Sequence, residues 1–227
     1  MSATHSLGLP RLHLRRTDST NHRAREMAVR GAPHGTLVTA SEQSAGRGRQ
    51  GRTWSTPPGQ ALLCSLVIRD PSRLLSLAAG IAVAEVVSPR ARLKWPNDVL
   101  VDGRKVAGIL VEGRPQERWA VLGIGLNVAL RVEDLPPETR ARAGSLGLGA
   151  EAVEPILERL LHHLERWTVA DVDSVLDQVR RRDALLGERI RWLGGQGVAD
   201  GVDRAGRLVV LSGGHRLLLE AGEVHFA

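Results

Sequence analysis

Two lysines stand out because the chain otherwise uses arginine for its basic residues. Lys94 and Lys105 are the only lysines among the 31 lysines and arginines of this 227-residue sequence, and both lie in the stretch LKWPNDVLVDGRKVAGILVEG. Arginine is a planar fork and lysine a compact point charge on a flexible stem, so a site that needs one of them rejects the other. The retention of lysine at these two positions therefore indicates a chemical role.

The stretch GRGRQGR (residues 46–52) is typical of a loop that binds an anion. Its glycines let backbone N–H groups approach a ligand, and Arg47, Arg49 and Arg52 offer charge and paired donors to phosphate or carboxylate oxygens. The spacing fits neither the P-loop nor the dinucleotide-binding motif, and it is equally compatible with an Arg-Gly nucleic-acid-binding segment. Trp54, just beyond it, packs either on a purine or on the fold itself.

The pentapeptide KWPND places a cation, an amide and a carboxylate at the end of a strand. Pro96 fixes its own φ and holds the preceding residue extended, so Asn97 and Asp98 are presented on a turn. Closure of a hairpin is the alternative explanation of this turn. On the strand that follows, Lys105 lies at the beginning, and Gly108 leaves room for a ligand to approach the backbone.

Composition and charge limit the classes of protein to consider. A formal charge of +6 and a pI near 10.9 suggest anionic partners: nucleic acid, a phosphate-bearing ligand or an acidic protein. The single cysteine, Cys64, excludes an internal disulfide and leaves too few thiols for a zinc cluster. No apolar stretch approaches the length of a membrane span and the N-terminus lacks a hydrophobic signal region, so we expect a cytoplasmic protein that does not bind a membrane.

The pattern of apolar residues predicts an α+β protein with a mixed β-sheet flanked by helices. Periodicity and turn signals predict strands at 11–16, 35–43, 61–69, 91–95, 98–101, 104–113 and 118–128, and helices at 17–32, 72–88, 151–167 and 171–186. Residues 44–60 form a polar, glycine-rich loop that is expected to be mobile or shaped by a ligand. After Gly187, brief strands with glycine turns predict a small β-barrel, so we expect domains at 1–186 and 187–227.

Taken together, these segments resemble the biotin protein ligase family. The resemblance rests on DSTN (18–21), SEQSAGRGRQGRTW (41–54), KWPNDVLVDGRKVAGILVE (94–112), GIGLNV (123–128) and the C-terminal AGEVHF. All three asparagines and both lysines of the chain fall inside these motifs. The resemblance implies a class II synthetase-like catalytic domain with an SH3-like C-terminal barrel, activation of biotin by ATP to biotinyl-5′-AMP, and transfer of biotin to a lysine of a biotin carboxyl carrier domain.

The resemblance also implies roles for individual residues. For biotin binding, it points to Ser19, Thr20, Asn21, Gln43, Arg47, Gly48, Arg49, Lys105 and Gly108. For ATP and the adenylate, it points to Arg49, Arg52, Trp54, Lys94, Asn97, Lys105 and Asn127, with a turn-closing role as the alternative for Asn127. Lys105, Arg47 and Arg49 are the implied catalytic residues, and Asp98 is the nearest candidate ligand for Mg²⁺, which should accompany the triphosphate. These residue types suit the task, because a ureido group needs hydroxyls and amides and an acyl phosphate needs fixed cations.

The sequence departs from the family pattern at three places. Position 50 is glutamine where the family often has another basic residue, and the arginine that some members carry after the last strand has no counterpart, which puts contact of the barrel with the nucleotide in doubt. No helix-turn-helix precedes residue 17, so we expect the short form of the enzyme, without DNA binding.

Two other functions remain open from the sequence. One is a lipoate-type ligase or acyltransferase of the same fold, and the other is an Arg-Gly nucleic-acid-binding module. The sequence leaves the oligomeric state open between a monomer and a homodimer.

Overall fold

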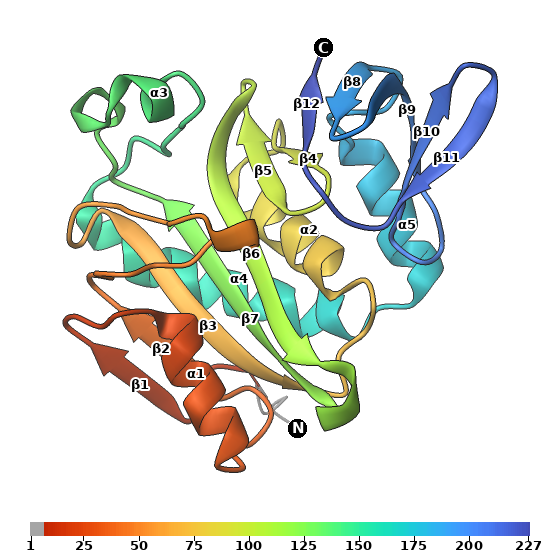
Figure 1. Cartoon of the computed structure of the whole chain (residues 1–227). Coiled ribbons are helices and arrows are strands. Elements are labelled where there is room, and N and C mark those ends of the chain that lie inside the picture. Colours follow the sequence, from red (N-terminus) through yellow and green to blue (C-terminus); the bar gives the residue numbers. More distant parts are fainter. Residues whose placement is uncertain (1–6) are drawn as a thin grey trace.

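The computed structural model describes residues 7–227, without the side chains of residues 114 and 115. Within this part of the chain the strands form a seven-stranded sheet, in the order β1-β2-β3-β7-β6-β5-β4, and a five-stranded sheet, in the order β11-β10-β9-β8-β12 (Figure 1). In the larger sheet β1 and β2 pair in parallel, whereas β2 and β3, β3 and β7, and β6 and β7 pair antiparallel. The predicted α+β class with a mixed sheet is confirmed.

The element boundaries follow the predicted ones closely. The strands of the larger sheet are β1 (Arg11–Leu14), β2 (Leu37–Ala40), β3 (Ala61–Arg69), β4 (Arg92–Lys94), β5 (Asp98–Val101), β6 (Arg104–Arg114) and β7 (Trp119–Asn127). Those of the smaller sheet are β8 (Arg189–Trp192), β9 (Gly195–Val202), β10 (Leu208–Ser212), β11 (His215–Leu219) and β12 (Val224–Phe226). The helices are α1 (Thr20–Val29), α2 (Leu75–Val87), α3 (Pro137–Arg140), α4 (Val153–Thr168) and α5 (Val172–Arg182), with 3-10 turns η1 (Arg49–Gly51), η2 (Pro115–Glu117), η3 (Val132–Asp134) and η4 (Ala150–Ala152).

Strand β3 is covered by helices on both faces of the sheet, which explains the apolar run ALLCSLVIR. Helix α1 packs on one face of the sheet, while α2 and α4 cover the other (Figure 1). A strand covered on both faces reads as a continuous apolar segment rather than an alternating one. Cys64 is buried in this strand as expected, and burial raises the pKa of its thiol to about 12.

The smaller sheet shares its core with the larger one. Ile190, Leu208 and Val224 belong to the same buried cluster as the side chains of α2 and α4. At the boundary the indole Nε1 of Trp95 donates a hydrogen bond to the carbonyl of Gly206 at 3.0 Å. This arrangement fixes the smaller sheet beside the KWPND turn.

The smaller sheet is antiparallel, with β11 and β12 at its two edges. Closure of these strands into an SH3-like barrel, and a domain boundary at 186/187, stay predictions. None of the helices between residues 7 and 227 is long and apolar enough to cross a membrane.

Candidate functional site

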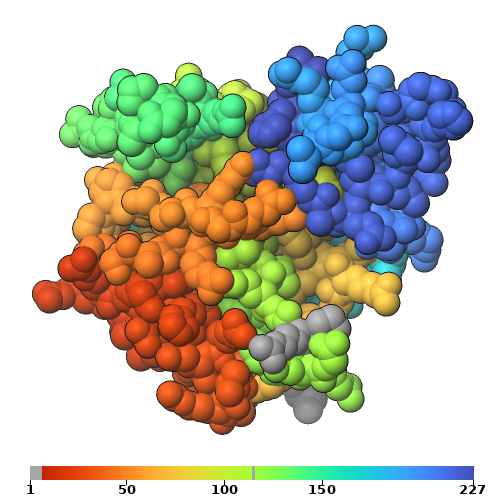
Figure 2. Space-filling view, in the orientation of Figure 1, coloured from red at the N-terminus to blue at the C-terminus, as the bar shows by residue number. Residues whose placement is uncertain are grey.

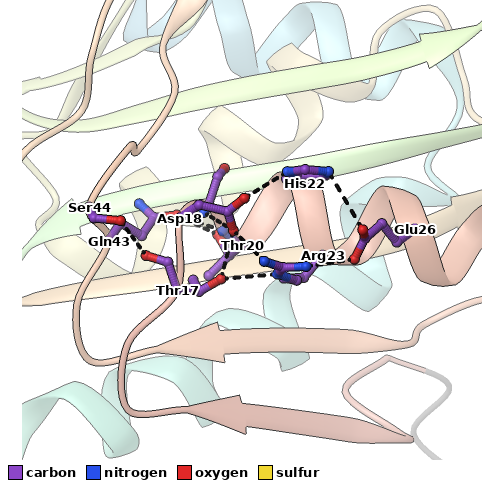
Figure 3. A network of polar contacts seen from close by, with 9 residues as sticks. Thr17, Asp18, Thr20, His22, Arg23, Glu26, Gln43 and Ser44 are labelled. Carbon is purple, nitrogen blue, oxygen red and sulfur yellow. Dashed lines mark hydrogen bonds and ion pairs between the residues drawn. The ribbon is translucent and has the colours of Figure 1, made fainter.

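Asp18 organises the chain where it enters helix α1 (Figure 3). Its Oδ1 accepts hydrogen bonds from the Ser19 backbone N–H at 2.8 Å and the Thr17 hydroxyl at 2.9 Å, and its Oδ2 lies 2.8 Å from Nδ1 of His22. Partial burial alone would raise the pKa of this carboxyl, but these hydrogen bonds and the charge of Arg23 outweigh it and lower the pKa to about 2. The helix begins at Thr20, within the predicted range 17–32, and the Ser19 side chain makes no capping hydrogen bond.

The residues of the STN motif face a polar network under helix α1. The side-chain oxygen of Gln43 accepts hydrogen bonds from the Thr20 backbone N–H at 2.7 Å and from its hydroxyl at 3.0 Å. Ser65, fully buried on β3, lies 2.6 Å from Oδ1 of Asn21 and 2.8 Å from the Thr20 hydroxyl. The buried hydroxyl of Ser19 has no hydrogen-bond partner within residues 7–227 and lines a cavity, so it is free to bind a ligand.

Ser65 and Glu112 contact the STN motif but were not among the residues predicted from the sequence. Glu112 on β6 accepts a hydrogen bond from Nδ2 of Asn21 at 2.8 Å, and its other oxygen lies 3.0 Å from Arg47. A signal for Ser65 was present, since it is a hydroxyl within an otherwise apolar strand. For Glu112 the only signal was a carboxylate at the end of a buried strand, which is not specific.

Gly123 on β7 allows Asn21 to approach the sheet. A Cβ at this position would lie 2.0 Å from Oδ1 of Asn21, closer than atoms can come. Glycine at position 123 is therefore required for the observed place of the amide.

The loop between β2 and β3 is held by its own backbone. The Gly48 N–H donates to the carbonyl of Arg52 at 2.7 Å, and the Trp54 N–H to the carbonyl of Gly46 at 2.9 Å. A Cβ at Gly46 would lie 2.2 Å from the Trp54 carbonyl, and Gln50 adopts a left-handed conformation with φ of 53°. The glycine spacing of GRGRQGR thus serves a compact turn, which presents its arginines beside β6.

The predicted cations meet carboxylate and amide oxygens. Nζ of Lys105 lies 2.6 Å from Oδ1 of Asp98, and Arg49 donates to the side-chain oxygen of Asn97 at 3.4 Å. The Asn97 amide also donates to the carbonyl of Ile109 at 3.0 Å, which fixes the turn against β6. Burial of Arg49 lowers the pKa of its guanidinium despite the nearby charge of Asp98.

The last strand of the chain reaches this site. Both terminal nitrogens of Arg52 contact the carboxylate of Glu223, which joins the loop to the smaller sheet. Nζ of Lys94 lies 5.9 Å from the centre of the Phe226 ring, and burial lowers the pKa of the Lys94 amine. Figure 2 shows the loop, in orange, running across the face of the molecule to meet the blue C-terminal sheet.

Trp54 packs flat on the sheet, one of the two alternatives for this residue. Gly108 and Gly125 are register partners on β6 and β7. A Cβ at Gly125 would lie 2.5 Å from the indole ring, and one at Gly108 would lie 3.1 Å from it. Nζ of Lys105 lies 5.6 Å from the ring centre, within range of a cation–π contact.

Two cavities meet at the Trp54 side chain. The first, of about 110 Å³, is lined by Ser19, Thr20, Asn21, Gln43, Arg47, Gly48, Arg49, Arg52, Thr53, Trp54, Leu63, Cys64, Asn97, Asp98, Lys105, Gly108, Ile109, Leu110, Gly123, Ile124, Gly125 and Glu223. The second, of about 690 Å³, is lined by Arg52, Thr53, Trp54, Ser55, Thr56, Pro57, Lys105, Asn127, Leu130, Asp134, Leu135, Pro136, Glu138, Thr139, Arg142 and Ala143. Arg52, Thr53, Trp54 and Lys105 line both.

The first cavity thus brings together most of the residues singled out in the sequence, but Lys94 and Asn127 lie outside its lining. Asn127 is buried and donates from Nδ2 to the carbonyl of Gly144 at 2.8 Å, so it anchors the segment after α3 while it borders the second cavity. Lys94 borders a smaller cavity beside Trp95 and Pro96. Nucleotide binding by these two residues stays a prediction.

Comparisons with known proteins agree with this geometry. The family model described as the biotin/lipoate A/B protein ligase family matches residues 13–128. The chain is 37% identical to the biotin--[acetyl-CoA-carboxylase] ligase of Mycobacterium tuberculosis, covering 92% of this chain and 85% of that protein, and 35% identical to the ligase of the same name from Paracoccus denitrificans, covering 94% and 99%. The structure resembles that of the biotin protein ligase from Aquifex aeolicus in complex with biotin and ATP, with a TM-score of 0.81, 26% identity and coverage of 97% and 100%. From its motifs, its fold and its relatives, the chain belongs to the biotin/lipoate A/B protein ligase family.

Proposed function

We propose that this protein is a biotin–protein ligase, which activates biotin with ATP to biotinyl-5′-AMP and transfers it to a lysine of a biotin carboxyl carrier domain. The observation that carries this proposal is the first cavity, which has neutral hydroxyls and amides at one end and Arg49 and Lys105 at the other. The names of the relatives from Mycobacterium tuberculosis and Paracoccus denitrificans support biotin and a carboxylase carrier as the substrates.

The neutral end of the cavity suits the ureido ring of biotin. The free hydroxyl of Ser19 and the amide of Asn21 can donate to the ureido oxygen, and the hydroxyl of Thr20 can accept from a ureido N–H. Gly108 and Gly125 allow the Trp54 ring to lie against the sheet, where it forms one wall of the cavity.

The charged end suits the first reaction. An oxygen of the biotin carboxylate attacks the α-phosphorus of ATP, a P–O bond forms, and the bond to pyrophosphate breaks. Two anions must approach, so catalysis depends on charge neutralisation and alignment. Lys105 is placed to neutralise them once it exchanges Asp98 for the substrates, with Arg47 and Arg49 beside it.

The second cavity suits the nucleotide. It shares Lys105 and Trp54 with the first cavity, so a nucleotide bound there would have its α-phosphate close to the shared wall. Arg142 and Lys105 offer positive charge to the phosphates in this cavity, and the indole offers an apolar surface to adenine.

Mg²⁺ would accompany the triphosphate. No cluster of three or more metal-ligating side chains occurs among the residues described, which suits an ion held chiefly by phosphate oxygens. Asp98, with its carboxylate in the lining of the first cavity, is the residue placed to supply one ligand, and the ion would add positive charge against the phosphates.

In the second reaction the lysine amine of the carrier attacks the acyl carbon of the mixed anhydride. A C–N bond forms, AMP leaves with the electrons of the C–O bond, and the amine loses a proton. Water competes with the amine, so the intermediate must be shielded, and the glycine-rich loop over the cavity is the segment placed to do so.

The test is a direct assay of both half-reactions. Purified protein with ATP, Mg²⁺ and labelled biotin should release pyrophosphate, and the label should move to a carrier domain. If neither occurs, the assignment is wrong. Lipoic acid in place of biotin tests the lipoate-type alternative, and salt-dependent binding of DNA or RNA without dependence on ATP would support the nucleic-acid-binding alternative. The cytoplasmic location and a monomeric or dimeric state stay predictions.

A further inference from the structure

Glu112 joins helix α1 to the loop between β2 and β3 beside the first cavity, although it is not part of the cavity lining. Strand alternation places Glu112 on the same face of β6 as Gly108 and Leu110, which do line the cavity. One carboxylate oxygen lies 2.8 Å from Nδ2 of Asn21 on helix α1, and the other lies 3.0 Å from Arg47 in the loop. Its side chain is 22% exposed, so both contacts are partly shielded from water.

The carboxylate determines which way the Asn21 amide points. A carboxylate can only accept hydrogen bonds, so the NH₂ group of Asn21 must face Glu112 and the carbonyl oxygen must face Ser65 and Gly123. The hydroxyl of Ser65 can donate or accept, and therefore does not by itself select an orientation. Glu112 thus fixes the orientation of the Asn21 amide, which Ser65 alone would leave open.

We propose that Glu112 is a positioning residue of the biotin-binding cavity, which orients the Asn21 amide and holds Arg47 at the cavity mouth. The inference rests on the proposed function, because its consequence is the affinity for biotin. With the NH₂ group held toward Glu112, one N–H of Asn21 bonds the carboxylate. The second N–H then keeps one direction and can donate to the ureido oxygen of biotin. Arg47, whose side chain is half exposed, is restrained by the same carboxylate.

Glu112→Gln is the informative substitution because it keeps the volume of the side chain and removes the carboxylate that fixes the orientation of the Asn21 amide. A glutamine can turn its own NH₂ group toward Asn21, and the Asn21 amide can then flip so that its NH₂ group faces Ser65. We expect the KM for biotin in adenylation to rise about tenfold, in keeping with the loss of one charge-assisted hydrogen bond. The KM for ATP should change about twofold at most, since Glu112 does not line the second cavity. The fall in kcat should be smaller than the rise in the KM for biotin and should reflect Arg47, which loses its charged partner.

Two further variants separate positioning from general damage. Glu158→Gln, an exposed site on α4 behind the sheet, makes the same charge change and should retain the wild-type KM for biotin. In the Asn21→Ala background, Glu112→Gln should raise the KM for biotin much less than in the wild type, because contacting residues are coupled. Additive effects, or a wild-type KM for Glu112→Gln, would overturn the proposal.

A readout without catalysis keeps this inference separate from the ligase assignment. The chain has three asparagines, so protein labelled with ¹⁵N-asparagine gives few side-chain amide signals. The Asn21 signals should shift strongly in Glu112→Gln and stay in place in Glu158→Gln. Unshifted signals would refute the role of Glu112 in orienting Asn21 even in an active enzyme, whereas a shift in a protein without ligase activity would refute the proposed function alone.

Discussion

Lys105 combines the contacts expected of the residue that neutralises the reacting anions. Its Nζ lies 2.6 Å from Asp98 and 5.6 Å from the Trp54 ring, and its side chain passes over Gly108, where a Cβ would lie 3.3 Å from Nζ. This narrow path favours a lysine, since a planar guanidinium is wider and cannot place a point charge in the same position.

Lys105→Ala is therefore expected to lower the rate of adenylation by about 10²–10³-fold, the usual effect of removing one preorganised stabilising group. Lys105→Arg should also lose most activity. Pyrophosphate release measures the rate and circular dichroism checks the fold. Arg104→Ala, at the exposed neighbouring position, is the control and should keep its activity. Full turnover of Lys105→Arg would contradict the argument from lysine scarcity.

Asp18 gives the protein a defined response to acid. Its pKa is lowered from 3.8 to about 2 in the folded state, so its contribution to stability is complete above the unfolded-state value and is lost as the pH falls toward 2. Asp18→Asn should therefore destabilise the protein at neutral pH, with a difference from the wild type that shrinks between about pH 4 and pH 2. Urea denaturation at several pH values measures this difference in the free energy of unfolding. Asp173→Asn, an exposed carboxyl paired with Arg204, should have little effect at any of them.

The paired glycines of β6 and β7 form the surface on which Trp54 rests. In Gly125→Ala the new methyl group would lie 2.5 Å from the indole, so the ring must move. We expect a loss of about 1–3 kcal/mol of stability and higher KM values for both biotin and ATP, because the ring borders both cavities. Thermal unfolding and steady-state kinetics test this. In a Trp54→Ala background the same change should cost little stability, and an equal cost there would mean that the indole is not the obstacle.

The sequence predicts the elements of this fold better than the contacts between them. Gln43 and the STN motif, which the family resemblance groups together, are joined by hydrogen bonds and line the same cavity. Glu112 was not, because its partner Asn21 lies 91 positions away and only the sheet brings them together. Asn127 shows the same limit, since its bond to Gly144 depends on how the segment after α3 folds back. Short polar motifs can be recognised from neighbouring residues in the sequence. The partners of residues such as Asn21 and Asn127 depend on tertiary packing and cannot.

Because the two sheets share a core, we expect them to unfold as a single unit. Ile190 of β8 is fully buried in the cluster that also contains the side chains of α2 and α4. Ile190→Ala should destabilise the whole chain by about 2–5 kcal/mol, and β7 and β9 should lose protection from hydrogen exchange in the same transition. Leu193→Ala, at a fully exposed position in the turn between β8 and β9, should change stability by less than about 0.5 kcal/mol. Two separate transitions would instead support independent domains divided near residue 186.

The common wall of the two cavities has a consequence for inhibitor design. Because Arg52, Thr53, Trp54 and Lys105 line both cavities, two fragments that contact these residues from the two cavities could be joined by a short tether. Tethering makes the second binding event intramolecular, and the linked compound gains affinity over its separate halves. A mutation of Trp54 or Lys105 that weakened such a compound would also alter the lining of both cavities.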